Sequence, residues 1–252
     1  MSAGINSTSG NKLNLKIALI GYGKMGKAIE SIAIERGHEV VLKINSQNLS
    51  ALNKENLQKA DVAIEFTNPH SAVSNIFDCL NAGTPLICGS TGWLDHLPEI
   101  KKACEEKYGA FLYASNFSVG VNIFFEVNKK LAQLMARQVE YDVAIEEIHH
   151  TQKKDSPSGT AISLAEQVLQ ELSRKKKWVN QPSGDAEELV IMSKRIDPAP
   201  GTHSIKYSSA VDDIEIIHTA HSRGGFALGA VLAAEFIHDK KGIFNMQDVL
   251  GL

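Results

Sequence analysis

A glycine-rich turn near the beginning of the chain constrains the fold more than any other feature. The apolar segment Lys16–Ile20 runs directly into the hexapeptide Gly21-Tyr22-Gly23-Lys24-Met25-Gly26. In such a strand–turn–helix unit, the first glycine permits a tight turn, the second lets the backbone approach a pyrophosphate, and the third lets helix and strand pack closely. The N-terminus of the following helix offers N–H donors and positive potential to phosphate groups. The turn therefore predicts a dinucleotide-binding βαβ unit whose contacts include residues 21–26.

Strand-like and helix-like segments alternate through the first half of the chain. We expect strands at residues 40–44, 60–66, 85–88 and 110–113, and helices at 25–35, from 68 onward and at 97–107. Asn68 suits the N-cap of the second of these helices, and Pro69 suits its first position. Strands that alternate with helices of about 10–15 residues predict βαβ units and a parallel sheet.

The pattern changes after residue 116. We expect a helix at 119–135, a strand at 141–148 and a helix from 160 to about 176. Ser158 is expected to cap the start of this last helix, and the lysine run 175–177 is expected to form its solvent-exposed end. Strand-like segments then follow one another at 189–196, 203–207 and 214–218, before helices at 226–237 and 246–250. Strands without intervening helices indicate an antiparallel or mixed sheet. The predicted fold class is α/β, with an N-terminal Rossmann-type parallel sheet and an α+β domain that contains a mixed sheet.

Composition limits the classes of partner. The chain has 252 residues, 43% of them hydrophobic, and its formal net charge of -3 gives no general case for binding nucleic acid or a membrane. No apolar run reaches the ~20 residues that span a bilayer. Residues 1–14 are polar and lack an apolar signal core, so we expect a loose extension. Three widely spaced cysteines without a Cys-x-x-Cys pair argue against a disulfide framework or a zinc site, and they favour a reducing cytoplasm.

Small or polar loops follow three of the predicted strands in the first half. Ligands of parallel α/β sheets bind outside the carboxyl ends of the strands, so these loops are expected to line one crevice with the glycine turn. The predicted cofactor contacts in these loops are Phe66, Thr67, Gly89, Ser90, Thr91, Ala114, Ser115, Asn116 and Phe117.

The choice between NADH and NADPH stays open. An acidic residue that binds the adenosine ribose is expected about 20 residues beyond the turn. The chain has Lys43-Ile44-Asn45-Ser46 at that place, without a carboxylate that would repel a 2′-phosphate. Lys43 either attracts that phosphate or is an ordinary solvent-exposed strand residue. NADPH is at least as well supported as NADH.

The segment from Glu147 to Ala161 carries the chemistry. Histidine exchanges protons near neutral pH, which makes His149 a candidate proton carrier, and Lys153 can donate a proton or neutralise developing charge. Pro157 and Gly159 favour a loop rather than a helix for the segment after His149. Ser158-Gly159-Thr160 opens a helix, whose first N–H groups form a cradle for a carboxylate or phosphate. Asp155 is expected to restrain the loop or to pair with a nearby lysine.

The remaining histidines give no metal site. Adjacent His149 and His150 do not easily bind one ion together, and neither a cysteine nor a spaced third ligand follows, so no metal is predicted. Structural roles are expected for the later histidines His203, His218 and His221. Arg223 is a weaker candidate for contacting a substrate carboxylate.

These residues together resemble the dihydrodipicolinate reductase family of the bacterial and plant lysine/diaminopimelate pathway. The family signature is an acidic strand end, His-His, a lysine four residues after the first histidine, an aspartate, and Pro-Ser-Gly-Thr-Ala. Residues 147–161 match it without a gap, and residues 116–122 and 242–250 match two further family blocks. The resemblance covers nearly all of the chain after residue 15.

The resemblance implies a fold, a reaction and an assembly. It implies a dinucleotide-binding domain at 15–118, rejoined by 224–252, and a substrate-binding and tetramerisation domain at 119–223. It implies hydride transfer from NAD(P)H to a cyclic dicarboxylate imine, giving tetrahydrodipicolinate, by a homotetramer. His149 matches the family's general acid/base and Lys153 its proton donor. The residues that match substrate-binding positions are His150, Ser158, Gly159 and Thr160. Residues 45–59 form a shorter segment than in many members and lack the usual ribose-binding acid, which leaves the cofactor preference open.

Three alternatives remain. An aspartate-type amino-acid dehydrogenase has a similar two-domain build, but the Pro-Ser-Gly-Thr block at 157–160 speaks against it. A nicotinamide-sensing protein without catalysis needs the glycine turn but not a proton donor beside an anion cradle. A Rossmann-type domain that has lost its ligand is opposed by the intact glycines.

Overall fold

The computed structural model describes residues 13–252, which form two compact units. Unit 1 contains residues up to 114 together with 227–249, and unit 2 contains 115–226 together with 250–252. The domain boundaries given above, with their binding roles, stay a prediction. The extension expected at residues 1–14 lies, up to residue 12, outside the described residues.

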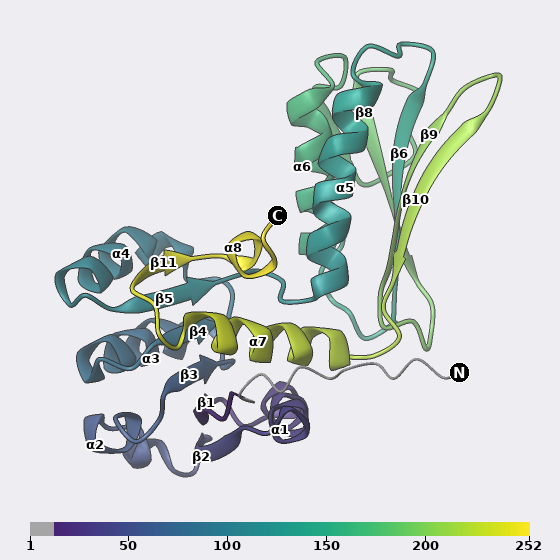
Figure 1. Ribbon diagram of the computed structural model, residues 1–252. Helices are drawn as coiled ribbons and strands as arrows, with labels where there is room; N and C mark the ends of the chain where they lie inside the picture. The colour runs from purple at the N-terminus through teal and green to yellow at the C-terminus, as the bar shows by residue number, and fades with distance from the viewer. Residues whose placement is uncertain (1–12) are drawn as a thin grey trace, which may run out of the picture. The chain divides into compact units, whose positions relative to one another are not determined.

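Unit 1 is built on a six-stranded sheet in the order β11-β5-β4-β3-β1-β2, and every pair of neighbours is parallel (Figure 1). The predicted parallel sheet is confirmed. Its strands are β1 (Lys16–Ile20), β2 (Glu39–Ile44), β3 (Val62–Glu65), β4 (Leu86–Cys88), β5 (Ala110–Tyr113) and β11 (Gly242–Phe244). Its helices are α1 (Lys24–Arg36), η1 (Leu49–Ala51), α2 (Lys54–Leu57), α3 (Pro69–Ala82), η2 (Leu94–His96), α4 (Leu97–Glu106), α7 (Gly224–Ile237) and α8 (Met246–Leu250).

Helices cover both faces of this sheet, with α2, α3 and α4 on one side and α1 and α7 on the other (Figure 1). Strands β3 and β4 are buried at every position, as expected for a parallel sheet covered on both faces. The Asn68 side chain accepts the N–H groups of His70 and Ser71, and Pro69 is the first residue of α3. The predicted helix start is therefore confirmed.

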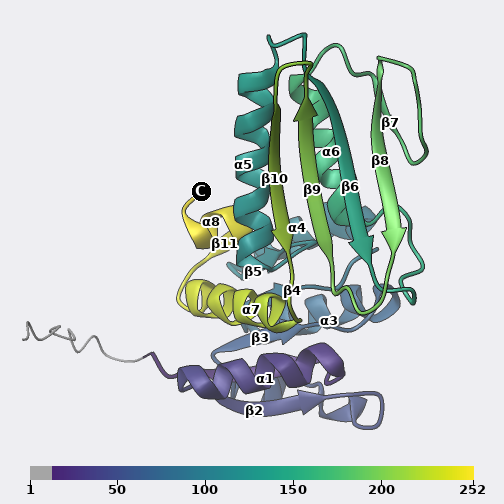
Figure 2. The ribbon, with the colours of Figure 1, turned by 90° about the vertical axis from the view of Figure 1, so that its right-hand side faces the viewer.

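Unit 2 is built on a five-stranded mixed sheet in the order β10-β9-β6-β8-β7. The central strand β6 is parallel to β8 and antiparallel to β9, which confirms the predicted mixed sheet. Helices α5 and α6 lie against one face of the sheet (Figures 1 and 2). The elements are α5 (Val119–Met135), β6 (Asp142–His149), α6 (Gly159–Glu171), β7 (Lys177–Val179), β8 (Glu188–Arg195), β9 (Thr202–Ser208) and β10 (Asp213–Thr219).

The core of unit 2 lies between the sheet and its two helices. Successive side chains of a strand point to opposite faces, so Val143, Ile145, Glu147 and His149 share the covered face of β6. The first two residues belong to the apolar core, and the last two continue the same buried row. The strand thus places a carboxylate and an imidazole at the end of a hydrophobic face.

Two details differ from the expectation. Helix α6 ends at Glu171 rather than near residue 176, because Leu172 leaves the helical conformation and the chain turns to form the edge strand β7. Lys175 is not solvated: its side chain is 2% exposed, and its Nζ donates to the Glu188 carbonyl at 2.9 Å and pairs with Asp142 at 2.6 Å. Helical periodicity misses both features, since they depend on contacts with distant strands. Among the helices of residues 13–252, none combines the length and apolar character needed to cross a bilayer.

Candidate active site

The glycine turn of unit 1 has the geometry that a dinucleotide requires. Gly21 has φ +98°, and a Cβ atom there would lie 2.0 Å from the carbonyl oxygen of Phe66. A Cβ atom on Gly26 would lie 2.5 Å from the Gly21 carbonyl oxygen. Gly23 has open space where its Cβ would be, at the N-terminus of α1. The first and third glycines therefore serve close packing, while the second leaves the backbone accessible to a phosphate.

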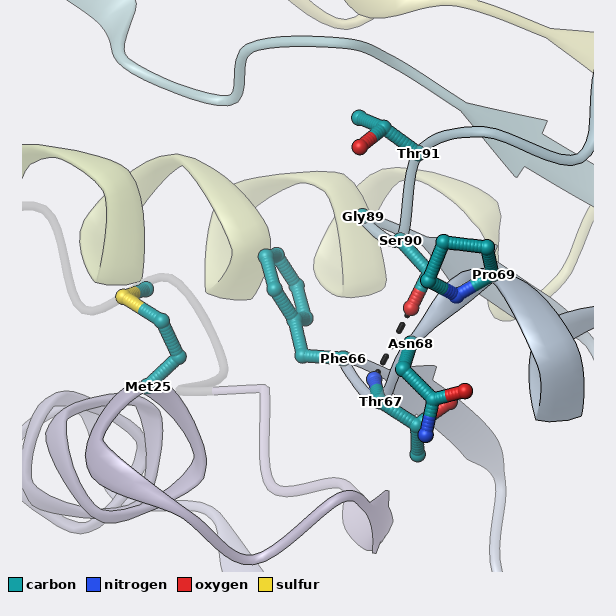
Figure 3. A pocket seen from close by; sticks show the side chains of 8 residues that line it. All are labelled: Met25, Phe66, Thr67, Asn68, Pro69, Gly89, Ser90 and Thr91. Carbon is teal, nitrogen blue, oxygen red and sulfur yellow. Dashed lines mark hydrogen bonds between the residues drawn. The ribbon is translucent and has the colours of Figure 1, made fainter. Parts of the chain in front are cut away.

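A cavity of about 210 Å³ lies beside this turn, at the carboxyl ends of β3 and β4 (Figure 3). It brings together six of the predicted cofactor contacts, and it adds Asn68 and Pro69, which the sequence treated only as a helix start. The lining residues are Met25, Phe66, Thr67, Asn68, Pro69, Gly89, Ser90 and Thr91. The Thr67 N–H donates to Ser90 Oγ at 2.8 Å, which joins the loops after the two strands.

A buried carboxylate lies beneath these loops. Glu65 is fully buried at the end of β3, and it accepts the Thr67 N–H at 3.1 Å, the Thr67 hydroxyl and the Cys88 thiol at 3.0 Å. Asn75 donates to the same carboxylate at 3.4 Å. Burial, with the adjacent Glu65, holds the pKa of Cys88 far above its usual value, so the thiol stays protonated. Glu65 escaped the sequence reasoning, which considered only loop residues.

Lys43 is engaged by its neighbours. Its ammonium forms an ion pair with Glu30 of α1 and lies 5.2 Å from the centre of the Tyr22 ring. The Tyr22 hydroxyl donates to Glu30 as well. Hydrogen bonds from Lys43 and Tyr22 hold the pKa of Glu30 below its usual value. The end of β2 therefore presents a lysine whose charge is already paired, although 43% of its side chain remains exposed.

The predicted cofactor segment 114–117 falls on the boundary of the two units. Ala114 belongs to unit 1, whereas Ser115, Asn116 and Phe117 belong to unit 2. Phe117 is buried, and Asn116 donates to the Thr160 hydroxyl at 3.4 Å. Asn116 is thus tied to the helix start in unit 2.

The predicted catalytic segment is a loop between β6 and α6. His149 ends β6, and α6 begins at Gly159 with Ser158 as its N-cap, accepting the Ala161 N–H at 3.2 Å. Lys153 pairs with Asp155, with both Nζ–O distances at 2.9 Å. This contact holds the pKa of Asp155 below its usual value and selects lysine pairing as the role of that aspartate. His150 is partly buried beside the turn.

The start of α6 can hold an anion. The first N–H groups of a helix have no intrahelical acceptor, and here they belong to Gly159 and Thr160. Open space lies where a Cβ atom of Gly159 would be, so a ligand can approach the backbone. This loop therefore combines an imidazole, an ammonium group and a helix N-terminus within twelve residues.

Glu147 contacts both the end of β6 and the start of α6. Its carboxylate is fully buried and accepts the Ser158 N–H at 3.1 Å to each oxygen, while the Arg195 guanidinium lies 3.3–3.4 Å from Oε1. His149 Nδ1 lies 3.3 Å from Oε2, within ion-pair range but without an aligned hydrogen bond. Burial alone favours the neutral carboxyl, but contacts with His149 and Ser158 outweigh it and hold the pKa of Glu147 well below its usual value.

His203 of β9 completes this cluster. Its ring packs edge-on against the His149 ring at 5.1 Å, and its Nε2 lies 3.1 Å from Ser158 Oγ. Burial, aided by the neighbouring His149, lowers the pKa of His203 to about 4, so its ring is neutral near pH 7. The sequence contained a signal for Glu147, because it lies two residues before His149 on the same face of a strand. Nothing local in the sequence links His203 or Arg195 to this place.

The prediction of no metal depends on the absence of a spaced third ligand after His149 and His150, and His203 is a ligand of that kind. Ligand atoms of Glu147, His149 and His203 lie within 4.8 Å of one another, a spacing that can hold an ion. The Glu147 carboxylate is already neutralised by Arg195 and hydrogen-bonded to Ser158, which weakens it as a metal ligand. The expectation of no metal stays a prediction.

Of the other residues singled out, His218 lies opposite His203 in the register of β10 and β9. His218 on β10 is half-buried and packs against the Phe124 ring at 5.9 Å, in keeping with a structural role. His221 and Arg223 are exposed in the segment between β10 and α7.

The sequence also matches known proteins along almost its whole length. Residues 15–117 match the family described as "Dihydrodipicolinate reductase, N-terminus", and residues 120–250 match "Dihydrodipicolinate reductase, C-terminus". The chain belongs to the dihydrodipicolinate reductase family. The resemblance inferred from the motifs is therefore confirmed.

Curated members of the dihydrodipicolinate reductase family include close relatives. A protein from Christiangramia forsetii named 4-hydroxy-tetrahydrodipicolinate reductase is 49% identical over 238 residues, which cover 94% of this chain and 98% of that protein. A protein of the same name from Methanosarcina barkeri is 39% identical over 211 residues, or 82% of this chain and 78% of that protein.

Solved structures share the fold. The dipicolinate-bound dihydrodipicolinate reductase from Paenisporosarcina sp. TG-14 has a TM-score of 0.74 at 22% identity and covers 94% of this chain and 99% of its own. An engineered D-amino acid dehydrogenase bound to NADP⁺ has a TM-score of 0.52 at 12% identity, with 93% of each chain covered. At these identities the likeness concerns the architecture.

Proposed function

We propose that the protein reduces a dihydrodipicolinate-type cyclic dicarboxylate imine to tetrahydrodipicolinate with NAD(P)H, as a step of lysine/diaminopimelate biosynthesis. The observation that carries this proposal is the loop after β6, in which a proton carrier, a lysine and a helix N-terminus follow one another. The relative that is 49% identical over nearly the full length bears the name of this activity.

The residues of unit 1 fit a nicotinamide dinucleotide. Gly23 exposes backbone at the start of α1, and the cavity lined by Thr67, Ser90 and Thr91 offers hydroxyl groups beside it. When bound, the nicotinamide cofactor supplies the hydride. The chain's own residues then need to hold the acceptor and to provide the balancing proton.

Unit 2 offers groups for both tasks. Reduction of a C=N-conjugated ring moves electron density toward the ring nitrogen, so a proton donor is required there. We assign that donation to His149, assisted by Lys153, whose charge also stabilises the developing negative charge. The two substrate carboxylates are assigned to His150 and to the N–H and hydroxyl groups of Ser158, Gly159 and Thr160.

The cofactor proposal includes both NADPH and NADH. Residues 43–46 contain no acidic side chain that would repel a 2′-phosphate, and Lys43 is partly exposed there. Its pairing with Glu30 makes the lysine a weaker anchor for that phosphate than a free ammonium. We therefore expect KM values for the two cofactors within about tenfold of each other, a ratio worth about 1.4 kcal/mol.

The assembly proposal is a cytoplasmic homotetramer formed through the sheet of unit 2. Helices α5 and α6 lie on only one face of that sheet (Figure 2). Apolar side chains such as Ile217, which is 60% exposed, alternate onto the other face. Light scattering coupled to size-exclusion chromatography measures the mass, and a value near four times 27.4 kDa supports the proposal. A monomeric mass contradicts it.

A coupled assay tests the activity. Aspartate semialdehyde, pyruvate and the upstream synthase generate the unstable substrate, and the absorbance of NADH and NADPH is followed in separate reactions. We expect cofactor oxidation only when all three components and the protein are present. Oxidation that ignores the substrate, or activity with aspartate and NAD(P)⁺ instead, contradicts the proposal and favours the aspartate-type dehydrogenase. Tight cofactor binding without any turnover favours the sensing protein.

A further inference from the structure

We propose that Glu147 is a positioning residue that aligns the proton carrier His149 and the anion-binding start of α6 as one unit, with Arg195 anchoring its carboxylate. The inference rests on the proposed function, because it assigns His149 and the helix start their roles in the reaction. It adds three residues, Glu147, Arg195 and His203, to the groups on which turnover depends.

The first contact orients the imidazole. His149 Nδ1 faces the Glu147 carboxylate at 3.3 Å without an aligned hydrogen bond. The negative charge of the carboxylate favours an N–H over a lone pair on the facing nitrogen, so we place the proton of the neutral ring on Nδ1. This leaves Nε2 as the nitrogen that exchanges a proton with the substrate. The His203 ring packs against the His149 ring at 5.1 Å between centroids, which restricts rotation of the His149 ring.

The second contact sets the position of the helix start. The Ser158 N–H donates to both carboxylate oxygens of Glu147 at 3.1 Å, although the two residues are eleven positions apart. Ser158 then caps α6 through its Oγ. The direction of the next N–H groups, at Gly159 and Thr160, therefore follows from where Glu147 holds Ser158.

The third contact balances the charge and reaches the lysine. A buried carboxylate without a cation is costly, and Arg195 of β8 supplies the cation. The same guanidinium donates to the Asp155 carbonyl oxygen at 2.5 Å, and the Asp155 carboxylate holds Lys153. One connected network thus touches the proton carrier, the lysine and the anion cradle.

Glu147→Gln tests the role of the charge at nearly constant shape. The glutamine amide can donate to His149 Nδ1, which stabilises the opposite tautomer and places the proton on Nε2. Mutation of a group that orients a metal-binding histidine typically costs about 10–100-fold, and we expect a similar fall in kcat here. The KM for the cofactor should stay within about twofold of the wild-type value, because unit 1 is unaltered.

Glu146→Gln is the matched control. Glu146 is the preceding residue of β6, faces the opposite side of the sheet and pairs with Lys194 at 2.6 Å. It lies outside the network, so its variant should keep wild-type kcat. Equal losses of kcat in the two variants overturn the proposal, as does a Glu147→Gln enzyme with wild-type kcat.

Nitrogen NMR of ¹⁵N-histidine-labelled protein gives a readout that does not depend on activity. The His149 signals, assigned by their loss in His149→Gln, should report the Nδ1–H tautomer in the wild type and a shift toward Nε2–H in Glu147→Gln. If the His149 tautomer is the same in Glu147→Gln as in the wild type, the positioning role is overturned, whether or not the protein shows reductase activity. A wild-type protein without reductase activity but with the expected tautomer change contradicts the proposed function alone.

Arg195→Lys serves if Glu147→Gln does not fold. It keeps a cation beside Glu147 but loses the fork that also reaches the Asp155 carbonyl. We expect kcat to fall by about 3–10-fold, less than for loss of the carboxylate charge. A folded Arg195→Lys enzyme with unchanged kcat and unchanged substrate KM overturns the proposal.

Discussion

Two fully buried glutamates, one in each unit, lie under the loops that carry the candidate site. Glu65 ends β3 in unit 1, and Glu147 lies near the end of β6 in unit 2. Each accepts a backbone N–H from the loop that follows its strand, at 3.1 Å in both cases. The two carboxylates thus share one task, which is to fix the course of a loop.

Their surroundings differ in charge. Glu65 is held by neutral donors, the Thr67 hydroxyl, the Cys88 thiol and the Asn75 amide, and within residues 13–252 it forms no ion pair. Glu147 meets a guanidinium and two imidazoles. We infer that a buried carboxylate among neutral donors shapes the loop above it, whereas one beside imidazoles also sets which ring nitrogen carries a proton.

The largest loss of turnover is expected in unit 2, at the proposed proton donor His149. His149→Gln should lower kcat by about 10²–10⁴-fold, because the imidazole that delivers the proton is lost. The dissociation constant for NADPH, measured by fluorescence titration, should change little, since no residue of unit 1 is altered. Wild-type turnover in this variant breaks the assignment of proton transfer to unit 2.

Lys153→Ala should damage both turnover and substrate binding. We expect kcat to fall by roughly 10²-fold, the usual cost of removing one group that stabilises developing charge, together with a raised KM for the dicarboxylate. Lys154→Ala, at the exposed neighbouring lysine, is the control and should resemble the wild type. Equal losses of kcat in the two variants would mean that the general positive charge of the loop matters, rather than the Lys153–Asp155 arrangement.

The pH dependence of stability sharpens the contrast in charge. His203 has a folded-state pKa of about 4 against an ordinary value of 6.5, so the unfolded chain binds more protons between these pH values. The free energy of unfolding should therefore fall as the pH is lowered, by roughly 2 kcal/mol between pH 7 and pH 5. Urea unfolding at a series of pH values measures this.

Two histidine variants test whether His203 causes this pH dependence of stability. His203→Gln should remove most of that pH dependence, whereas His221→Gln, at an exposed histidine, should keep it. A His203→Gln protein with the full wild-type slope shows that another group loses the proton on folding.

The smallest effect is expected in unit 1. Glu65→Gln places amide N–H donors against the Thr67 and Cys88 donors, and an unsatisfied buried donor costs about 1–3 kcal/mol. Thermal unfolding should detect that loss, and the KM for NADPH should rise by about 3–10-fold as the Thr67 loop shifts, a change of about 1 kcal/mol. An unchanged KM with reduced stability would limit Glu65 to a role in folding.

Much of the fold was predictable because it depends on local patterns. The glycine turn, the alternation of strands and helices, and the Asn68-Pro69 helix start each state their structure in a few residues. The edge strands β7 and β11 were not predicted, since each is three residues long without a fully buried position and is defined by its pairing with β8 or β5.

In unit 2 the candidate site was predictable only in its contiguous part. The loop from His149 to Thr160 is one stretch of sequence, so its residue types predicted that an imidazole, a lysine and a helix start lie together. Arg195 and His203 reach it from β8 and β9 through sheet register, in which Arg195 lies opposite His149 and His203 opposite Glu147. Strand register joins positions about 50 residues apart, and no local pattern encodes it.

The most direct test of the contrast between the two glutamates measures kcat and the NADPH KM of Glu147→Gln and Glu65→Gln side by side in the coupled assay. We predict that Glu147→Gln lowers kcat at a nearly unchanged NADPH KM, and that Glu65→Gln raises the NADPH KM while kcat stays within about threefold of the wild type, under 1 kcal/mol. The reverse pattern, or the same pattern in both variants, contradicts the account in which Glu65 fixes the cofactor loop and Glu147 sets the proton position on His149.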